Sequence, residues 1–201
     1  MILEGIVTTL DATRSPSHAP GAPPVNVSPM GPFVSEDMRQ LTLRPYQSSR
    51  TYRNLKQCGE GVFHVTDDAL LLAKTAVGTV SPEVTAASEI RGSYLVEACR
   101  AYEFRVRELD DSSERTRIIA DVVHVHRLRN FFGWNRAKHA VLEAAILATR
   151  IAFLPADDIA QQFGALEPLV EKTAGPRERE AFEFLRDYVR AASQTESKGE
   201  R

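Results

Sequence analysis

The chain has 201 residues, of which 43% are hydrophobic and 26% charged, and its formal net charge is −2. This composition is typical of a globular protein with a sizeable core, and the charge gives no electrostatic argument for binding nucleic acid. No apolar run has the length of a transmembrane helix, and the first residues lack the basic start and apolar core of a secretory signal. We therefore expect a cytoplasmic protein with neither a membrane nor a nucleic-acid partner. Two cysteines, Cys58 and Cys99, are too few for a disulfide framework and are expected to be reduced thiols.

The first two thirds of the chain are rich in strand patterns. Alternating or β-branched residues predict strands over 2–10, 25–34, 40–45 and 61–66, and a hairpin from 101 to 128 with its turn at 110–113. The proline-rich residues 11–24 predict a loop. Because Pro29 and Pro32 cannot donate to a central ladder, the strand over 25–34 is expected at an edge or with a bulge.

Helical patterns are scattered at first and then dominate. A short helix is predicted over 48–57 with a serine cap, and a second over 69–77 with Asp67 or Asp68 as its cap, followed by an irregular stretch at 79–93. Apolar residues at helical spacing then predict helices over 135–153 and 157–172 and a third after Gly175-Pro176, with a polar tail from 195. Strands first and helices last indicate an α+β protein, in which a β-barrel precedes a C-terminal helical subdomain. The expected domains are a barrel over 1–134, a helical subdomain packed on it over 135–195, and a flexible tail over 196–201.

The segment 44–66 carries the strongest chemical signal. Arg44 ends a predicted strand, and Ser49, Arg50 and Thr51 follow it in a polar turn, with Asn54 three residues beyond Thr51. A guanidinium beside hydroxyls and free backbone N–H groups is a sound cradle for a phosphate. On these residues alone, the plainer interpretation is a helix cap next to a solvated arginine.

Three motifs in order make the segment more specific. Ser28-Pro29, Thr51-x-x-Asn54-Leu55 and the strand Gly61–Val65 resemble the motifs of the FMN-binding split-barrel proteins, the superfamily of the flavin reductases. The opening strand Glu4–Thr9 and the helical segment Asn135–Glu143 resemble one branch of that superfamily, a family of uncharacterised archaeal and bacterial proteins. The resemblance covers roughly residues 3–155. It implies an FMN-binding split β-barrel followed by a helical subdomain.

The resemblance also implies roles for particular residues. Arg44, Ser49, Arg50 and Thr51 would hold the FMN phosphate, and Asn54 the ribityl chain or the ring edge. The ring edge would meet the backbone of Asn26, Val27, Ser28, Pro29 and Met30 and that of His64, Val65 and Thr66. Thr66 stands where the family often has asparagine. Thr51 and Asn54 are expected to lie in a polar turn outside the core.

The implied function is that of an FMN-dependent oxidoreductase or flavin reductase acting as a homodimer, with a small-molecule redox partner. The return strand Ile118–Val125 supports a partner surface because residues on both of its faces are apolar. No residue has the setting of a general acid or base, and the sequence names neither electron donor nor acceptor. Two alternatives stay open: a non-catalytic FMN-binding or carrier protein, and a barrel that binds another small ligand.

His124 and His126 lie two apart on a predicted strand and therefore point to the same face. Paired imidazoles can bind a metal, but no convincing third ligand is nearby, so we expect no metal site. The resemblance would place this strand near a dimer interface or the rim of a flavin site.

Overall fold

The computed structural model describes residues 1–10, 25–78 and 80–199, with side chains to Gln194. The predicted loop 11–24 and the last two residues of the predicted tail lie outside this range. The chain forms two compact units. One contains Met1–Thr66 and Ser81–Phe131, and the other contains Asp67–Val80 and Phe132–Arg201. The unit boundaries therefore place residues 67–80, which precede the whole of the predicted hairpin, with the C-terminal helices.

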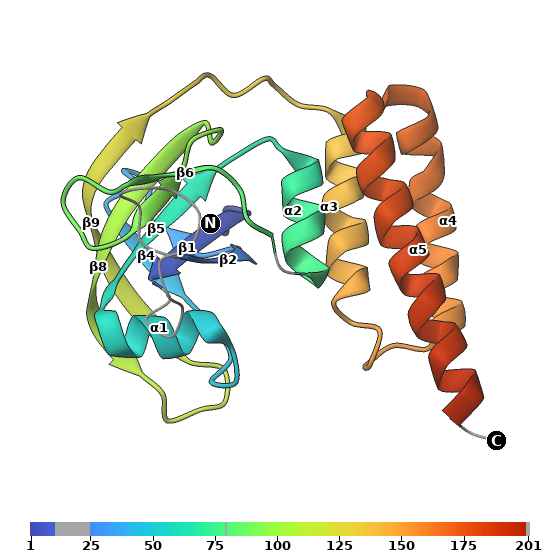
Figure 1. Ribbon diagram of the computed structural model, residues 1–201, viewed down its shortest axis with the longest axis horizontal. Coiled ribbons are helices and arrows are strands. Elements are labelled where there is room, and N and C mark those ends of the chain that lie inside the picture. Colours follow the sequence, from blue (N-terminus) through green and yellow to red (C-terminus); the bar gives the residue numbers. More distant parts are fainter. Residues whose placement is uncertain (11–24, 79, 200–201) are drawn as a thin grey trace. The chain divides into compact units, whose positions relative to one another are not determined.

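The first unit is built on a seven-stranded sheet in the order β2-β1-β5-β8-β9-β4-β3, in which all neighbouring strands are antiparallel (Figure 1). Its strands are β1 (Gly5–Leu10), β2 (Val25–Met30), β3 (Phe33–Val34), β4 (Gln40–Leu43), β5 (Glu60–Val65), β8 (Arg100–Asp110) and β9 (Arg117–Arg127). β3 also meets the residues that precede β1, because Leu3 N donates to Pro32 O at 3.1 Å and Val34 N donates to Met1 O at 2.9 Å. The sheet thereby curves into a barrel, which hides most of its edges.

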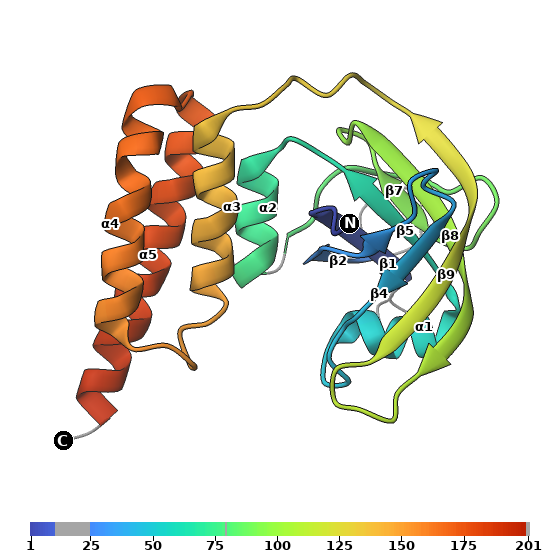
Figure 2. The same cartoon turned by 180° about the vertical axis from the view of Figure 1, so that it is seen from behind.

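Every second residue along the strands points into the barrel, and these side chains fill its inside. Residues of one phase form a single cluster with two side chains of helix α1 (Arg50–Cys58), which lies at one end of the barrel in both ribbon views (Figures 1 and 2). The buried members are Val7, Val34, Leu41, Leu43, Tyr52, Leu55, Phe63, Tyr102, Phe104, Ile118 and Ala120. Gly61 is required on β5, because a Cβ there would lie 2.6 Å from the Phe104 ring.

The predicted single strand over 25–34 is two strands. β2 pairs with β1, whereas β3 pairs with β4, and the change of partner falls at Gly31-Pro32. Pro32 has no backbone N–H, so it cannot extend a ladder as a donor, while its carbonyl serves in closing the barrel. The expectation of an edge strand holds for β2, which has a strand partner on one side only.

The stretch 79–93, expected to be irregular, contains short strand β6 (Val84–Ala86), which pairs with β7 (Ser93–Leu95). This small hairpin covers the outer face of the barrel sheet. Thr8 Oγ1 donates to Ser93 O at 2.7 Å, and Val62 and Ala101 form a buried cluster with Ile90. Local sequence does not show these strands, because their stability comes from the barrel surface beneath them.

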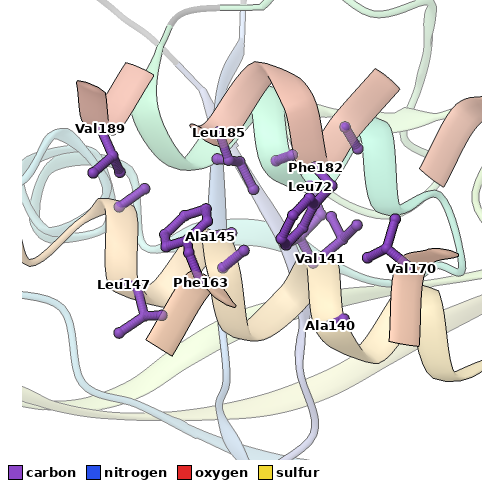
Figure 3. Close-up of a cluster of buried hydrophobic side chains, with 14 of the residues drawn as sticks. Leu72, Ala140, Val141, Ala145, Leu147, Phe163, Val170, Phe182, Leu185 and Val189 are labelled. Atoms are coloured by element: carbon purple, nitrogen blue, oxygen red, sulfur yellow. The ribbon is translucent and has the colours of Figure 1, made fainter. Parts of the chain in front are cut away.

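The second unit is a bundle of four helices: α2 (Ala69–Val77), α3 (Arg136–Ala148), α4 (Ala156–Thr173) and α5 (Pro176–Gly199). Caps mark where two of them begin, since Asp68 accepts from Leu71 N and Asn135 accepts from Lys138 N, each at 3.0 Å. Apolar side chains from all four helices meet in one core (Figure 3). Both this bundle and the barrel agree with the predicted α+β class.

Helix α3 is shorter than the predicted 135–153. It ends at Ala148, and the following residues form a turn in which Arg150 N donates to Leu147 O and Phe153 N donates to Arg150 O, each at 2.9 Å. Phe153 is exposed. The helix was predicted to run on toward Pro155, whereas the turn that replaces its last residues still packs Ile151 and Leu154 against the helical core.

Candidate functional site

The N-terminus of α1 lies where the phosphate cradle was predicted. Ser49 is its cap and accepts from Tyr52 N at 3.1 Å, and Arg53 N donates to the Ser49 carbonyl at 3.3 Å. The backbone N–H groups of Arg50 and Thr51 have no partner within the described ranges, as expected for the first turn of a helix. No acidic residue lies in this turn, and the Arg50 side chain is exposed. The helix dipole and the guanidinium therefore favour an anion here.

Thr51 and Asn54 do not lie in an exposed polar turn, so that expectation is wrong. They are on the face of α1 that meets the barrel and keep only 2% and 7% of their surfaces exposed. Asn26 Nδ2 donates to Thr51 Oγ1 at 3.2 Å, and Asn54 Nδ2 donates to Thr9 Oγ1 at 2.9 Å. These two bonds attach α1 to β2 and β1. The Thr51 hydroxyl proton remains able to donate, since a hydroxyl both donates and accepts.

The predicted ring-edge residues fall on two strands. Asn26, Val27, Ser28, Pro29 and Met30 make up most of β2, all half-buried, on the strand whose second edge has no ladder partner among the described residues. Such an edge presents backbone N–H and C=O groups that a planar ligand can use.

Val65 ends β5, with Thr66 directly after it, and both are half-buried. The Val65 carbonyl already accepts from Cys99 N at 2.9 Å. It therefore has one lone pair left for a ligand.

Arg44 precedes α1 in the chain. It follows β4 and lines an open pocket of about 450 Å³ that includes none of the other predicted site residues. Two further arginines line the same pocket, Arg115 and Arg117. Sequence reasoning missed both, although Arg117 opens β9 and Arg115 stands two residues before it, a spacing that indicates a shared face in an extended chain.

A polar cluster that the sequence did not predict lies between the barrel sheet and the β6–β7 hairpin. His64 is fully buried there. Its Nδ1 is 3.0 Å from the Ile6 carbonyl, and Leu95 N donates to its Nε2, also at 3.0 Å. These partners require the neutral tautomer with the proton on Nδ1, because Nε2 must accept. Burial lowers the pKa of His64 to about 4, against the opposing effect of the Ile6 carbonyl.

Glu103 is the second buried polar group of this cluster. Its carboxylate accepts from the backbone N–H groups of Ser88 and Glu89 at 2.7 and 2.8 Å, and one of its oxygens is 2.6 Å from His126 Nε2. Burial acts to raise the pKa of Glu103, but these hydrogen bonds outweigh it and hold the pKa below its usual range. The charged carboxylate thus fastens the loop of the hairpin to the sheet.

His124 and His126 share a face, as predicted, with their ring centroids 4.5 Å apart. His126 bonds Glu103 and stacks on Tyr94, with ring centroids 4.2 Å apart. No cluster of three histidine, cysteine or acidic side chains that could hold a metal occurs in the part of the chain that the structure describes. Both cysteines are free thiols, as predicted.

The antiparallel barrel with α1 at one end, followed by a helical part, is the fold of the FMN-binding split-barrel proteins. The chain belongs to the DUF447 family, described as proteins of unknown function: the N-terminal model of that family matches residues 3–129 and its C-terminal model matches residues 135–187. The resemblance to an uncharacterised branch of the superfamily is thereby confirmed.

Two solved structures illustrate the likeness. An FMN-bound DUF447 protein from Methanosarcina mazei is 21% identical with a TM-score of 0.73, over 93% of this chain and 94% of that one. Nitrilotriacetate monooxygenase component B from Bacillus cereus is 18% identical with a TM-score of 0.50, over 62% of this chain and 68% of that one. At these identities the likeness establishes the fold. No helix within the described residues is long and apolar enough to cross a membrane.

Proposed function

We propose that this protein binds FMN and acts as an oxidoreductase or flavin reductase whose substrate is undefined. The observation that carries the proposal is the match, over nearly the whole of both chains, to a family member whose structure contains FMN. The residues present fit the group. The N-terminus of α1 offers backbone donors and the Arg50 guanidinium for a dianionic phosphate, and the open edge of β2 offers backbone groups for the ring.

In this arrangement Ser49, Arg50 and the first N–H groups of α1 hold the phosphate, while the backbone of Asn26–Met30 and of Val65–Thr66 borders the ring. Thr51 and Asn54 position α1, since their side chains bond to Asn26 and Thr9. When bound, FMN supplies the redox chemistry. Among the described residues, none beside this site is assigned as an acid or base, so the protein's part is to bind and orient the flavin.

Comparing flavins tests the cradle directly. FMN, FAD and riboflavin are titrated into the apo protein, with flavin fluorescence as the readout. We expect FMN to bind most tightly, since FAD needs room for a second nucleotide and riboflavin has no phosphate. Arg50→Gln should reduce the affinity for FMN about ten- to hundred-fold and leave that for riboflavin unchanged, because it removes charge-assisted bonds to phosphate. Arg39→Gln, another exposed arginine of the same unit, is the matched control.

Equal affinities for FMN and riboflavin in the wild type would refute the phosphate cradle, and no flavin binding would refute the proposal.

A second assay separates enzyme from carrier. Oxidation of NADH or NADPH by the FMN-loaded protein, above the rate with free FMN, is expected of a reductase. Tight FMN binding without turnover would favour the alternative, a non-catalytic FMN-binding protein.

We further propose that the protein is a homodimer. β9 pairs with β4 from Ile118 to Asp121, and Val122 N donates to Arg39 O at 2.8 Å. Among the described residues no strand lies beside this edge of β9 beyond that point, where the side chains of Val123 and Val125 are exposed. An apolar strand edge of this kind is a ready surface for a second copy. A cytoplasmic location stays a prediction from the sequence.

A further inference from the structure

Three arginines line one pocket at the end of the barrel where β4 stops and the β8–β9 hairpin turns. Figure 2 shows the course of these strands. Leu43 pairs with Ile118 in the last step of the β4–β9 ladder, so the next residues along, Arg44 and Arg117, face each other across the strands. Arg115 stands two residues before Arg117 and therefore lies on the same face. We call the pocket they line the arginine pocket.

This juxtaposition brings like charges together, although Arg115 Nε donates to the Arg44 carbonyl at 3.3 Å and Asp110 lies opposite Arg117. Like charges directly opposite each other on neighbouring strands are destabilising. Within the described ranges, no ion pair joins Arg44, Arg115 or Arg117 to a carboxylate. Asp110 pairs with Arg117 in the β8–β9 ladder and is the one acidic residue of the lining, so the pocket keeps an excess of positive charge.

The remaining lining adds polar and aromatic surface. The hydroxyl groups of Thr42, Ser112 and Ser113 border the pocket, and Phe33 exposes 43% of its surface at its edge. Next to it, the Arg115 guanidinium lies 5.6 Å from the ring centroid of Tyr46. Guanidinium forks bind phosphate oxygens in pairs, and exposed rings stack on a flat ligand. The volume of about 450 Å³ is that of a small-molecule site.

We propose that the arginine pocket binds the diphosphate group of a nucleotide, at a site separate from the one that holds the flavin. Arg44, Arg115 and Arg117 are the phosphate ligands, the hydroxyl groups complete the polar contacts, and Phe33 supports the base. The pocket is separate because α1, whose N-terminus forms the phosphate cradle, contributes no residue to its lining.

The test uses ADP as the probe and adenosine, which has no phosphate, as the ligand control. Calorimetric titrations are made on the full chain with and without saturating FMN. We expect ADP to bind equally in both conditions and adenosine to bind at least tenfold more weakly. Arg44→Gln and Arg117→Gln should each weaken ADP binding about ten- to hundred-fold. Arg39→Gln, which makes the same change of charge on an exposed loop of the same unit, should not.

Arg44→Gln also reports on the fold, since it relieves like-charge repulsion. Its thermal midpoint without ligand should equal or exceed that of the wild type, so a loss of ADP binding cannot be ascribed to unfolding. Displacement of ADP by FMN, or a loss of FMN affinity in Arg44→Gln, would assign the pocket to the flavin phosphate and overturn the proposal. Absent ADP binding, equal binding of adenosine, or an equal loss in Arg39→Gln would overturn it as well. Because ADP is also titrated without FMN, the experiment tests ADP binding even if the protein binds no flavin.

Discussion

His64 shows how one buried side chain makes the whole fold sensitive to pH. Its pKa is about 4 in the folded protein and 6.5 for an ordinary histidine, so below pH 6.5 the unfolded chain binds a proton that the folded chain does not. The contribution of His64 to the free energy of unfolding is fully present above pH 6.5 and is lost as the pH falls toward 4. The full effect is about 3 kcal/mol. Protonation of Nε2 would also break the hydrogen bond from Leu95 N, because a protonated ring nitrogen cannot accept.

We therefore predict that the free energy of unfolding of the wild type falls steeply between pH 6.5 and 4.5. The measurement is urea unfolding at several pH values. His64→Gln should be less stable at pH 7 but should lose less stability on acidification. His139→Gln, which changes an exposed histidine, should keep the wild-type slope. An unchanged slope in His64→Gln would show that other groups govern the acid sensitivity.

Asn54 is predicted to be a stability residue as well as a site residue. Asn54→Ala leaves the buried Thr9 hydroxyl without its donor and should cost about 1–3 kcal/mol of unfolding free energy. Arg53→Ala changes an exposed neighbour on the same helix and should stay within about 0.5 kcal/mol of the wild type. Denaturant unfolding without flavin measures both. Wild-type stability combined with lost FMN affinity in Asn54→Ala would instead indicate direct contact with the flavin.

The contrast between Ser49 and Asn54 shows what sequence can predict at this scale. A serine before a helical pattern is a local signal, and its capping bond is as predicted. The burial of Asn54 depends on Thr9, 45 residues away on β1, which no pattern near Asn54 indicates. Likewise, Arg44 could be singled out from the sequence, but its neighbours Arg115 and Arg117 come from a distant hairpin.

At the scale of elements, the loop of the β6–β7 hairpin is fastened to the sheet by the carboxylate of Glu103. Each oxygen of Glu103 accepts one backbone N–H of the hairpin loop, and a glutamine amide has one acceptor oxygen only. We predict that Glu103→Gln speeds amide hydrogen exchange at Ser88 or Glu89 and costs about 1–3 kcal/mol. Glu108→Gln, on the same strand and exposed, is the control. Unchanged exchange at both amides would show that the apolar contacts of Ile90 suffice to hold the loop.

The same hairpin explains why 79–93 could not be assigned from its own residues. Each strand has three residues, below the length at which alternation is informative, and the supporting groups Glu103 and Thr8 lie on other strands. The β8–β9 hairpin, with eleven residues in each strand, was predictable because its alternation is long.

At the scale of the whole molecule, the proposed dimer gives a direct prediction. Val125→Lys places a charge on the free edge of β9 and should convert a dimer to a monomer, since charged residues are the usual means of blocking an open strand edge. Sedimentation equilibrium at micromolar concentration measures the change. Glu108→Lys, at the other end of the β8–β9 hairpin, is the control. A wild-type protein that is monomeric with FMN bound would refute the dimer and show that one chain completes the flavin site.

The order of strands and helices was sufficient to predict the α+β class, because each type of element forms a long block with its own periodicity. It was not sufficient to show which core each element enters. In the sequence, helix α2 comes between β5 and β6. Its residues Leu70, Leu72 and Ala73 are nevertheless buried with side chains of α3, α4 and α5. Its position in the sequence would instead suggest that α2 belongs to the barrel unit.

The position of α2 has a consequence for synthesis on the ribosome. The last residue of the barrel unit is Phe131, so the barrel can fold while the chain beyond it is still being made. Helix α2 emerges earlier than β8 and β9 but lacks the helices that bury Leu70 and Leu72 until residues 132–199 follow. During that interval its apolar face is open to water and to other nascent chains. The C-terminal helices therefore serve as a delayed cover for a segment made long before them, and a chain that stops at the end of the barrel would retain an uncovered, aggregation-prone helix.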